Sequence, residues 1–183
     1  MRLILLRHAP SLTGGLLAGR RDVAADCGDR AALSRLAARI AAEAAGAGVL
    51  ASPALRCRQT AAALGLRPDR LDPALWEQDL GAWEGTDPAR LPDLGPLSPD
   101  ALAGHRPPGG ESFTDMAARV IPVLTALDRD TVVIAHAGTV RAALSMVVGP
   151  AALSFSVAPL SMTVLRRAGA DWAVDGVNLT WGT

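Results

Sequence analysis

The chain has 183 residues, half of them hydrophobic, and its 18 basic residues balance its 18 acidic residues. This length is enough for one core but short for two independent domains, and the balanced charge creates no field that would recruit nucleic acid or an anionic membrane. All basic residues are arginines, which excludes chemistry that needs lysine and leaves arginine, histidine or backbone amides to hold any anion.

The chain begins with a pattern of buried strand, irregular loop and helix. RLILL (2–6) predicts a short buried strand that ends at Arg7 and His8, and residues 9–19 predict a loop. Asp29 is placed to cap a helix from about 30 to 45, which Gly46 would end. The expected core face of this helix comprises Leu33, Leu36, Ala37, Ile40 and Ala44.

The next pattern repeats this order. VLAS (49–52) predicts a second buried strand, and Ser52 followed by Pro53 indicates an N-cap and first turn for a helix to about Leu64. LDPALWE (71–77) predicts a further extended segment. Glu77 would then lie near the end of a strand.

Residues 86–110 contain many prolines and glycines and show no clear period. We expect an irregular segment that covers the substrate rather than a linker, so that residues 1–183 form a single domain.

The C-terminal part predicts one more strand and helix and then two strands. Ser112 with Asp115 resembles a capping box for a helix to about Leu127, with a kink at Pro122. TVVIA (131–135) predicts a buried strand that ends at His136, before a helix over 138–148. Residues 161–167 and 172–178 favour an antiparallel pair.

Strands that alternate with helices predict a three-layer α/β/α sandwich with a mostly parallel central sheet. Such sheets bind ligands outside the carboxyl ends of their strands, where His8 and His136 are both expected. A single histidine in such a place is more often structural than functional, but two at equivalent strand ends favour an active site.

Arginines near predicted helix starts support an anion site. Arg56, Arg58 and Arg141 fall in first turns, where the helix dipole disfavours cations by about 0.3–1 kcal/mol each. A bound anion would compensate for this cost. For Arg56 we favour the anion, whereas Arg58 and Arg141 have the equally simple interpretation of pointing into solvent.

Five ordered blocks stand out along the chain: LLRHA (5–9), SPALRCRQTA (52–61), LWEQDLGAWEG (75–85), PPGGES (107–112) and VIAHAGTVR (133–141). In order and spacing they resemble the signatures of the histidine phosphatase superfamily, which includes cofactor-dependent phosphoglycerate mutases. WEG and PPGGES most resemble the α-ribazole-5′-phosphate phosphatases of cobalamin synthesis and related bacterial phosphatases.

The resemblance implies a phosphoglycerate mutase-like fold and a metal-independent phosphatase without a cofactor. It implies that His8 is the nucleophile, that Glu77 is the proton donor, and that Arg7, Arg56 and His136 surround the transferred phosphoryl group. His136, if protonated, would add positive charge, and the amides of Ala137 and Gly138 lie where a helix N-terminus binds phosphate. Ser11, Thr13 and Gly19 follow the nucleophile and would either line the pocket or form turns.

Other residues compete for some of these roles. Glu84 and Asp79 compete with Glu77 as the acid, and Glu84 would otherwise orient substrate or water. His105 is expected in solvent or at the rim of the substrate site. Cys57 is expected to be a small buried residue rather than a reactive thiol.

The main functional hypothesis is hydrolysis of a phosphomonoester through a phosphohistidine, with α-ribazole 5′-phosphate as the leading substrate candidate. The alternatives are a phosphoglycerate mutase, a broad small-molecule phosphatase and an inactive phospholigand-binding module on the same fold. A metal-dependent hydrolase is weaker, because the histidines lack a compact ligand motif. We expect a cytoplasmic protein whose partner is a small phosphorylated metabolite, with a homodimer left open.

Overall fold

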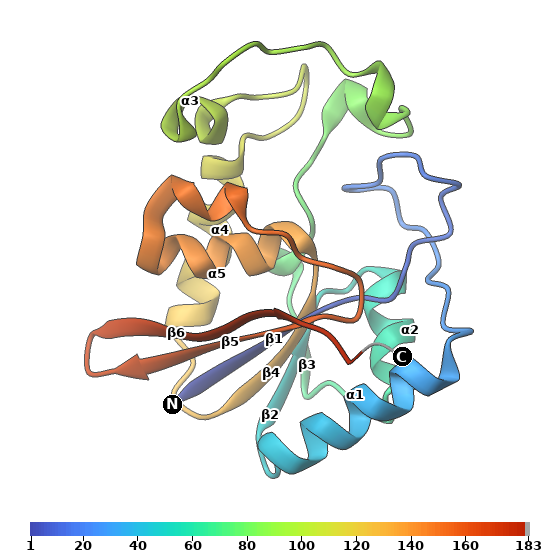
Figure 1. Cartoon of the computed structure of the whole chain (residues 1–183), viewed down its shortest axis with the longest axis vertical. Coiled ribbons are helices and arrows are strands. Elements are labelled where there is room, and N and C mark those ends of the chain that lie inside the picture. Colours follow the sequence, from blue (N-terminus) through green and yellow to red (C-terminus); the bar gives the residue numbers. More distant parts are fainter. Residues whose placement is uncertain (182–183) are drawn as a thin grey trace.

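The computed structural model describes residues 1–181 and shows one six-stranded sheet with helices on both faces (Figure 1). The strand order is β3-β2-β4-β1-β5-β6. The strands are β1 (Arg2–Arg7), β2 (Gly48–Ala51), β3 (Arg70–Leu71), β4 (Thr131–Ala135), β5 (Met162–Ala168) and β6 (Asp171–Leu179).

β1, β4, β2 and β3 are parallel, whereas β5 and β6 add an antiparallel edge. The prediction of a mostly parallel sheet in an α/β/α fold is therefore confirmed. In the parallel part, Arg7 is opposite Ala135 and Ala51 is opposite Ile134. This register brings the residues that follow β1, β4 and β2 to one edge of the sheet.

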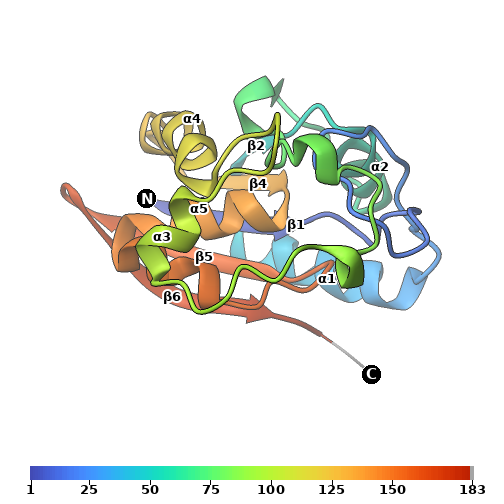
Figure 2. The same ribbon diagram turned by 90° about the horizontal axis from the view of Figure 1, so that it is seen from above.

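Two separate cores explain the three layers, because alternate residues of the central strands face opposite sides. Leu3 and Leu5 pack on the side of α4 and α5, and Ile4 and Leu6 pack on the side of α1 and α2. The larger helices are α1 (Arg30–Glu43), α2 (Leu55–Ala63), α4 (Phe113–Thr125) and α5 (Ala137–Val148). Figure 1 shows the sheet between these two helical layers, and Figure 2 shows α5 in front of the central strands.

The caps predicted for two helices are present. Asp29 accepts a hydrogen bond from the Ala32 amide at the start of α1, and Gly46 adopts a φ of 77° beyond its end. Ser112 and Asp115 form the predicted capping box of α4, and Pro122 lies inside that helix.

Two local predictions were wrong. Ser52 is not the N-cap of the second helix, since α2 begins at Leu55 with Ala54 at the N-cap position. Residues 71–77 are not an extended strand. Only Leu71 belongs to β3, and the proline that follows Asp72 begins the short 3₁₀ helix η1 (Pro73–Leu75), in which Asp72 caps the Ala74 amide.

Residues 86–110 are less irregular than expected, because they contain η3 (Pro88–Arg90) and α3 (Pro99–Gly104). Ser98 caps α3, and buried Ala103 joins the core on the α4 side. Figure 1 shows this segment at the top of the molecule, beyond α4 and α5. Two further 3₁₀ helices lie outside it: η2 (Gly81–Trp83) and η4 (Gly149–Ser154).

One stretch, Ala137–Ser154, is long and apolar enough to cross a membrane by length and composition. In the structure it comprises α5 and η4, and η4 begins at Gly149, which adopts a φ of 60°. Val140 and Leu144 of α5 are buried in the core on the α4 side. The stretch is therefore a core helix followed by a turn.

Candidate active site

His8 and His136 meet at the carboxyl edge of the sheet. His8 follows β1, His136 follows β4, and their ring centroids lie 5.2 Å apart in an edge-on arrangement. His8 is 4% exposed and His136 is fully buried. The parallel register of the two strands thus brings together residues that are far apart in the sequence.

Hydrogen bonding fixes the tautomer of His8. Its Nδ1 lies 2.6 Å from the Ala9 carbonyl, which can only accept a hydrogen bond, so Nδ1 carries the proton. Burial lowers the pKa of His8 to about 3, and the charges of Arg56 and Arg7 add to this effect. At neutral pH the ring is therefore neutral, with a free lone pair on Nε2.

Arg56 directs its charge at this lone pair. It lies in the first turn of α2, is fully buried, and its Nε donates to Nε2 of His8 at 3.3 Å. Its other nitrogens donate to the carbonyls of Ala18, Gly19 and Arg21. No carboxylate within residues 1–181 forms an ion pair with it, so a buried cation is left facing the nucleophile.

Arg7 and Arg141 line a cavity beside His8, whereas Arg56 and His136 are not among the residues that line it. Arg7 donates to the Val157 carbonyl at 2.5 Å and Arg141 to the Phe155 carbonyl at 3.1 Å, so one connection before β5 holds both. The buried Nε of Arg7 has no acceptor among the described residues. Burial lowers the pKa of Arg7, and the charges of Arg141 and Arg56 lower it further, which is the signature of a site that favours an anion.

Three side chains surround the His136 ring: Ser52, which precedes α2, Cys57 of α2, and Trp76. Nε2 of His136 lies 2.9 Å from the Ser52 hydroxyl and 3.6 Å from the Cys57 thiol, and the ring is stacked on Trp76. Burial lowers the pKa of His136 well below its usual value, so the ring is neutral and does not add the charge that protonation would bring. Cys57 is fully buried, and burial raises its pKa to about 12, so it remains a thiol.

Glu77 reaches the same cavity from the segment after η1. One carboxylate oxygen accepts from the Gln78 amide at 3.0 Å and the other from the Gly138 amide at 3.2 Å. A Cβ on Gly138 would lie 2.1 Å from the Glu77 carboxylate, so only glycine permits this approach. The first turn of α5 therefore donates to Glu77 through Gly138.

The competing carboxylates have different surroundings. Glu84 accepts from the amides of Gly19, Arg20 and Leu80, so it fixes two loops and is not among the cavity residues. Asp79 accepts from the Gly81 amide within a turn. The third histidine, His105, is half-buried and stacks on Trp83, with 5.5 Å between ring centroids.

The cavity has a volume of about 460 Å³ and a polar and an apolar part. The polar part includes Arg7, His8, Glu77 and Arg141. The predicted pocket residues Ser11 and Thr13 also line the cavity; Ala137 does not, and the apolar walls consist of Leu16, Leu17, Leu80, Phe113, Leu153 and Pro159. Within residues 1–181 no group of three or more His, Cys, Asp or Glu side chains is arranged to hold a metal ion.

For Arg141 the sequence left two interpretations open, an anion ligand or a solvent-facing residue, and the structure places it at the cavity. Its position in the first turn of α5 was the signal that could have decided this. Arg58 faces solvent, as one of its two interpretations predicted: it is exposed and donates to the Pro53 carbonyl.

Comparison with known proteins agrees with this arrangement. Residues 3–180 match the histidine phosphatase superfamily (branch 1), and no curated protein sequence matches the chain. The solved structure of TTHB049 from Thermus thermophilus is 30% identical, covering 97% of this chain and 99% of its own, with a TM-score of 0.76.

Two mycobacterial proteins are also similar over nearly their full lengths. Glucosyl-3-phosphoglycerate phosphatase Rv2419c is 25% identical with a TM-score of 0.82, and mycobacterial hydrolase 1 is 26% identical with a TM-score of 0.84. Each covers 98% of this chain and 99% of its own. With its family match and its paired strand-end histidines, this chain belongs to the histidine phosphatase superfamily and is an enzyme of the phosphatase or mutase type.

Proposed function

We propose that the protein is a phosphomonoester hydrolase that acts through a phosphohistidine on His8, without a metal ion or cofactor. The observation that carries this proposal is the Nε2 lone pair of His8, freed by the hydrogen bond from Nδ1 to Ala9 and facing Arg56. A neutral imidazole with a fixed tautomer is a competent nucleophile.

In the first half of the reaction, Nε2 of His8 forms a bond to phosphorus while the bond from phosphorus to the leaving oxygen breaks. Glu77 gives a proton to that oxygen, and Arg7 and Arg56 stabilise the phosphoryl oxygens together with His136. In the second half, water attacks the phosphohistidine and gives a proton to Glu77. Inorganic phosphate leaves and neutral His8 is restored.

The leading substrate candidate remains α-ribazole 5′-phosphate. Its supports are the WEG and PPGGES blocks and the apolar cavity walls, which suit an aromatic base beyond the phosphate. We propose that residues 86–110 cover this substrate, that it is a small metabolite met in the cytoplasm, and that no nucleic acid or membrane takes part. A homodimer remains an open alternative to a monomer.

A phosphoglycerate mutase is the alternative within the family. It would have to retain its product until the phosphoryl group returns. The similarity to a phosphatase, Rv2419c, favours hydrolysis. A broad small-molecule phosphatase and an inactive phospholigand-binding module complete the alternatives.

Trapping the phosphoenzyme tests the proposal. Wild-type protein quenched during turnover of p-nitrophenyl phosphate should hold a phosphoryl group that is labile in acid and stable in alkali, as an N-phosphate is, and His8→Ala should hold none. A phosphoenzyme that persists in His8→Ala would disprove the assignment. A screen with α-ribazole 5′-phosphate, nucleotides, sugar phosphates and phosphoglycerates in a chelator would rank the substrates, and loss of turnover on chelation would indicate a metallohydrolase.

A further inference from the structure

The segment that carries Glu77 has no regular structure to hold it. η1 ends at Leu75 and η2 begins at Gly81, so residues 76–80 belong to neither a helix nor a strand. An acid must lie within hydrogen-bond reach of the leaving oxygen, and an error of about 1 Å costs on the order of 10²-fold in rate. Other groups must therefore fix this backbone.

Arg119 of α4 performs this task through carbonyl groups. Its NH1 donates to the carbonyls of Ala74 at 2.6 Å and Trp76 at 2.8 Å, and its NH2 donates to the carbonyl of Glu77 itself at 3.0 Å. One planar guanidinium thus binds three carbonyls on both sides of the bend that presents the Glu77 side chain. Every nitrogen of the Arg119 guanidinium is engaged in these bonds or in bonds to Glu111, and Arg119 is not among the residues that line the cavity.

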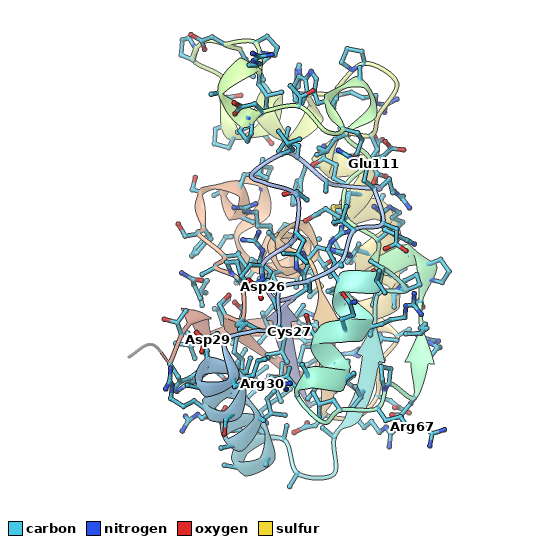
Figure 3. All side chains as sticks on the ribbon, turned by 90° about the vertical axis from the view of Figure 1, so that its right-hand side faces the viewer. Asp26, Cys27, Asp29, Arg30, Arg67 and Glu111 are labelled. Atoms are coloured by element: carbon cyan, nitrogen blue, oxygen red, sulfur yellow. The ribbon has the colours of Figure 1, made fainter. Side chains whose placement is uncertain are left out.

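Glu111 fixes the same segment through its N–H groups, those of the Asp79 backbone and the Gln78 side chain. Its carboxylate forms an ion pair with Arg119 and accepts from the Asp79 amide at 2.9 Å, and its carbonyl accepts from the Gln78 side chain at 2.7 Å. Burial raises the pKa of Glu111, but the hydrogen bonds from Arg119 and Asp79 outweigh this and leave the pKa lowered. Figure 3 labels Glu111 close to the start of α4.

We propose that Arg119, paired with Glu111, is the positioning residue for the acid of this enzyme and sets the efficiency of proton transfer from Glu77. The inference rests on the proposed function, because it concerns the same reaction. The donors of Arg119 are occupied by carbonyls and a carboxylate, so none is left to bind the phosphoryl group. Its loss should therefore affect the acid and spare the phosphoryl site.

The test compares two esters. Arg119→Met keeps an unbranched side chain as far as the position of Nε and removes all the donors. It should lower kcat/KM for glycerol 2-phosphate by about 10- to 10²-fold and kcat/KM for p-nitrophenyl phosphate by less than about 3-fold, because kcat/KM reports the first half of the reaction, in which the phenolate departs without protonation. Inhibition by vanadate should change little.

A double-mutant cycle separates positioning from general damage. In a Glu77→Gln background, Arg119→Met should add less than about 3-fold on glycerol 2-phosphate, because no proton remains to be positioned. Arg119→Lys, which retains the charge and part of the hydrogen bonding, should give an intermediate loss and supports the test if the Met variant does not fold. Arg166→Met, which breaks an exposed pair with Asp175 on the β5–β6 hairpin, is the matched control and should behave as wild type.

Equal losses on both esters in a folded variant, or additive losses in the double-mutant cycle, would overturn the positioning role of Arg119. The proposed function would stand in that case, provided that the wild-type protein hydrolyses the esters. A wild-type protein that hydrolyses neither ester and forms no phosphohistidine would overturn both.

Discussion

Two irregular segments border the cavity, and each is held by one guanidinium and one carboxylate. On the nucleophile side, Arg56 donates to the carbonyls of Ala18, Gly19 and Arg21. In the same loop, Glu84 accepts from the amides of Gly19 and Arg20. On the acid side, Arg119 binds the carbonyls of residues 74–77 and Glu111 binds the amide of Asp79.

The difference between the two sides lies in the pairing of charges. Arg119 and Glu111 form an ion pair, whereas Arg56 has no carboxylate partner within the described residues. A guanidinium that is neutralised by a carboxylate serves geometry alone. Arg56 donates to carbonyls and to the uncharged His8 ring, so its charge is not neutralised and can serve the phosphoryl group as well as the loop.

The largest effect should come from loss of Arg56, the guanidinium that has no carboxylate partner within the described residues. Arg56→Met removes the donor beside Nε2 of His8 and should lower kcat/KM by about 10³- to 10⁵-fold, the range seen when a phosphoryl-stabilising arginine is lost. Both esters should lose equally, because the proton donor is untouched. Arg58→Met, from the same helix but exposed, is the control for steady-state kinetics. A loss confined to alkyl esters would contradict the division between the two sides.

A change of the acid itself should show the opposite selectivity. Glu77→Gln keeps the shape of the side chain and removes its proton, so alkyl phosphates should slow by about 10²- to 10⁴-fold and p-nitrophenyl phosphate much less. Parallel kinetics on the two esters measure this difference. If Glu84→Gln gives the ester-dependent defect instead, the acid has been assigned to the wrong carboxylate.

The structure predicts a different result for Glu84. In Glu84→Gln, an NH₂ group faces backbone amides that now donate to a carboxylate, so the loop that surrounds Arg56 should loosen. We expect a loss of about 10-fold on both esters and about 1–3 kcal/mol in the free energy of unfolding. Kinetics combined with chemical denaturation will measure both, with Glu43→Gln on α1 as the control. Unchanged kinetics with lowered stability would restrict Glu84 to a structural role.

The last prediction concerns stability in acid, where His8 and Glu111 should lose their contributions in different pH ranges. The folded-state pKa of His8 is about 3 against 6.5 unfolded, so the unfolded chain binds the extra proton between these values. Stability should fall by about 1.4 kcal/mol per pH unit for this histidine from pH 6.5 downward. Glu111, whose pKa is lowered, should contribute its loss only below about 4.5.

Thermal melts of wild type and His8→Gln across this range will measure the contribution of His8. The variant should show a shallower decline between pH 6.5 and about 4.5, since its side chain does not titrate. An identical decline in both proteins would show that His8 does not carry this dependence.

The sequence was sufficient for the central fold because its signals were local. The apolar runs of β1 and β4 and the histidines that end them could be read directly, and so could the caps Asp29 and Ser112. Their positions at the sheet edge followed from parallel topology alone.

The sequence was insufficient where a residue's partner is distant. Ser52 next to Pro53 reads as a cap, but its hydroxyl lies beside His136, 84 positions further along. Glu84 looked like a rival acid because nothing local shows that amides from residues 19, 20 and 80 converge on it. Arg119 was not considered, since its carbonyl partners lie more than 40 positions away.

The contact between Gly138 and Glu77 has a consequence for how the parts of the site stay in register. Both oxygens of Glu77 accept hydrogen bonds from backbone amides, one from Gln78 and one from Gly138. Gly138 follows His136 by two residues, so Glu77 is tied to the same strand end that carries the second histidine. A shift of this strand end would therefore move Glu77 and His136 together.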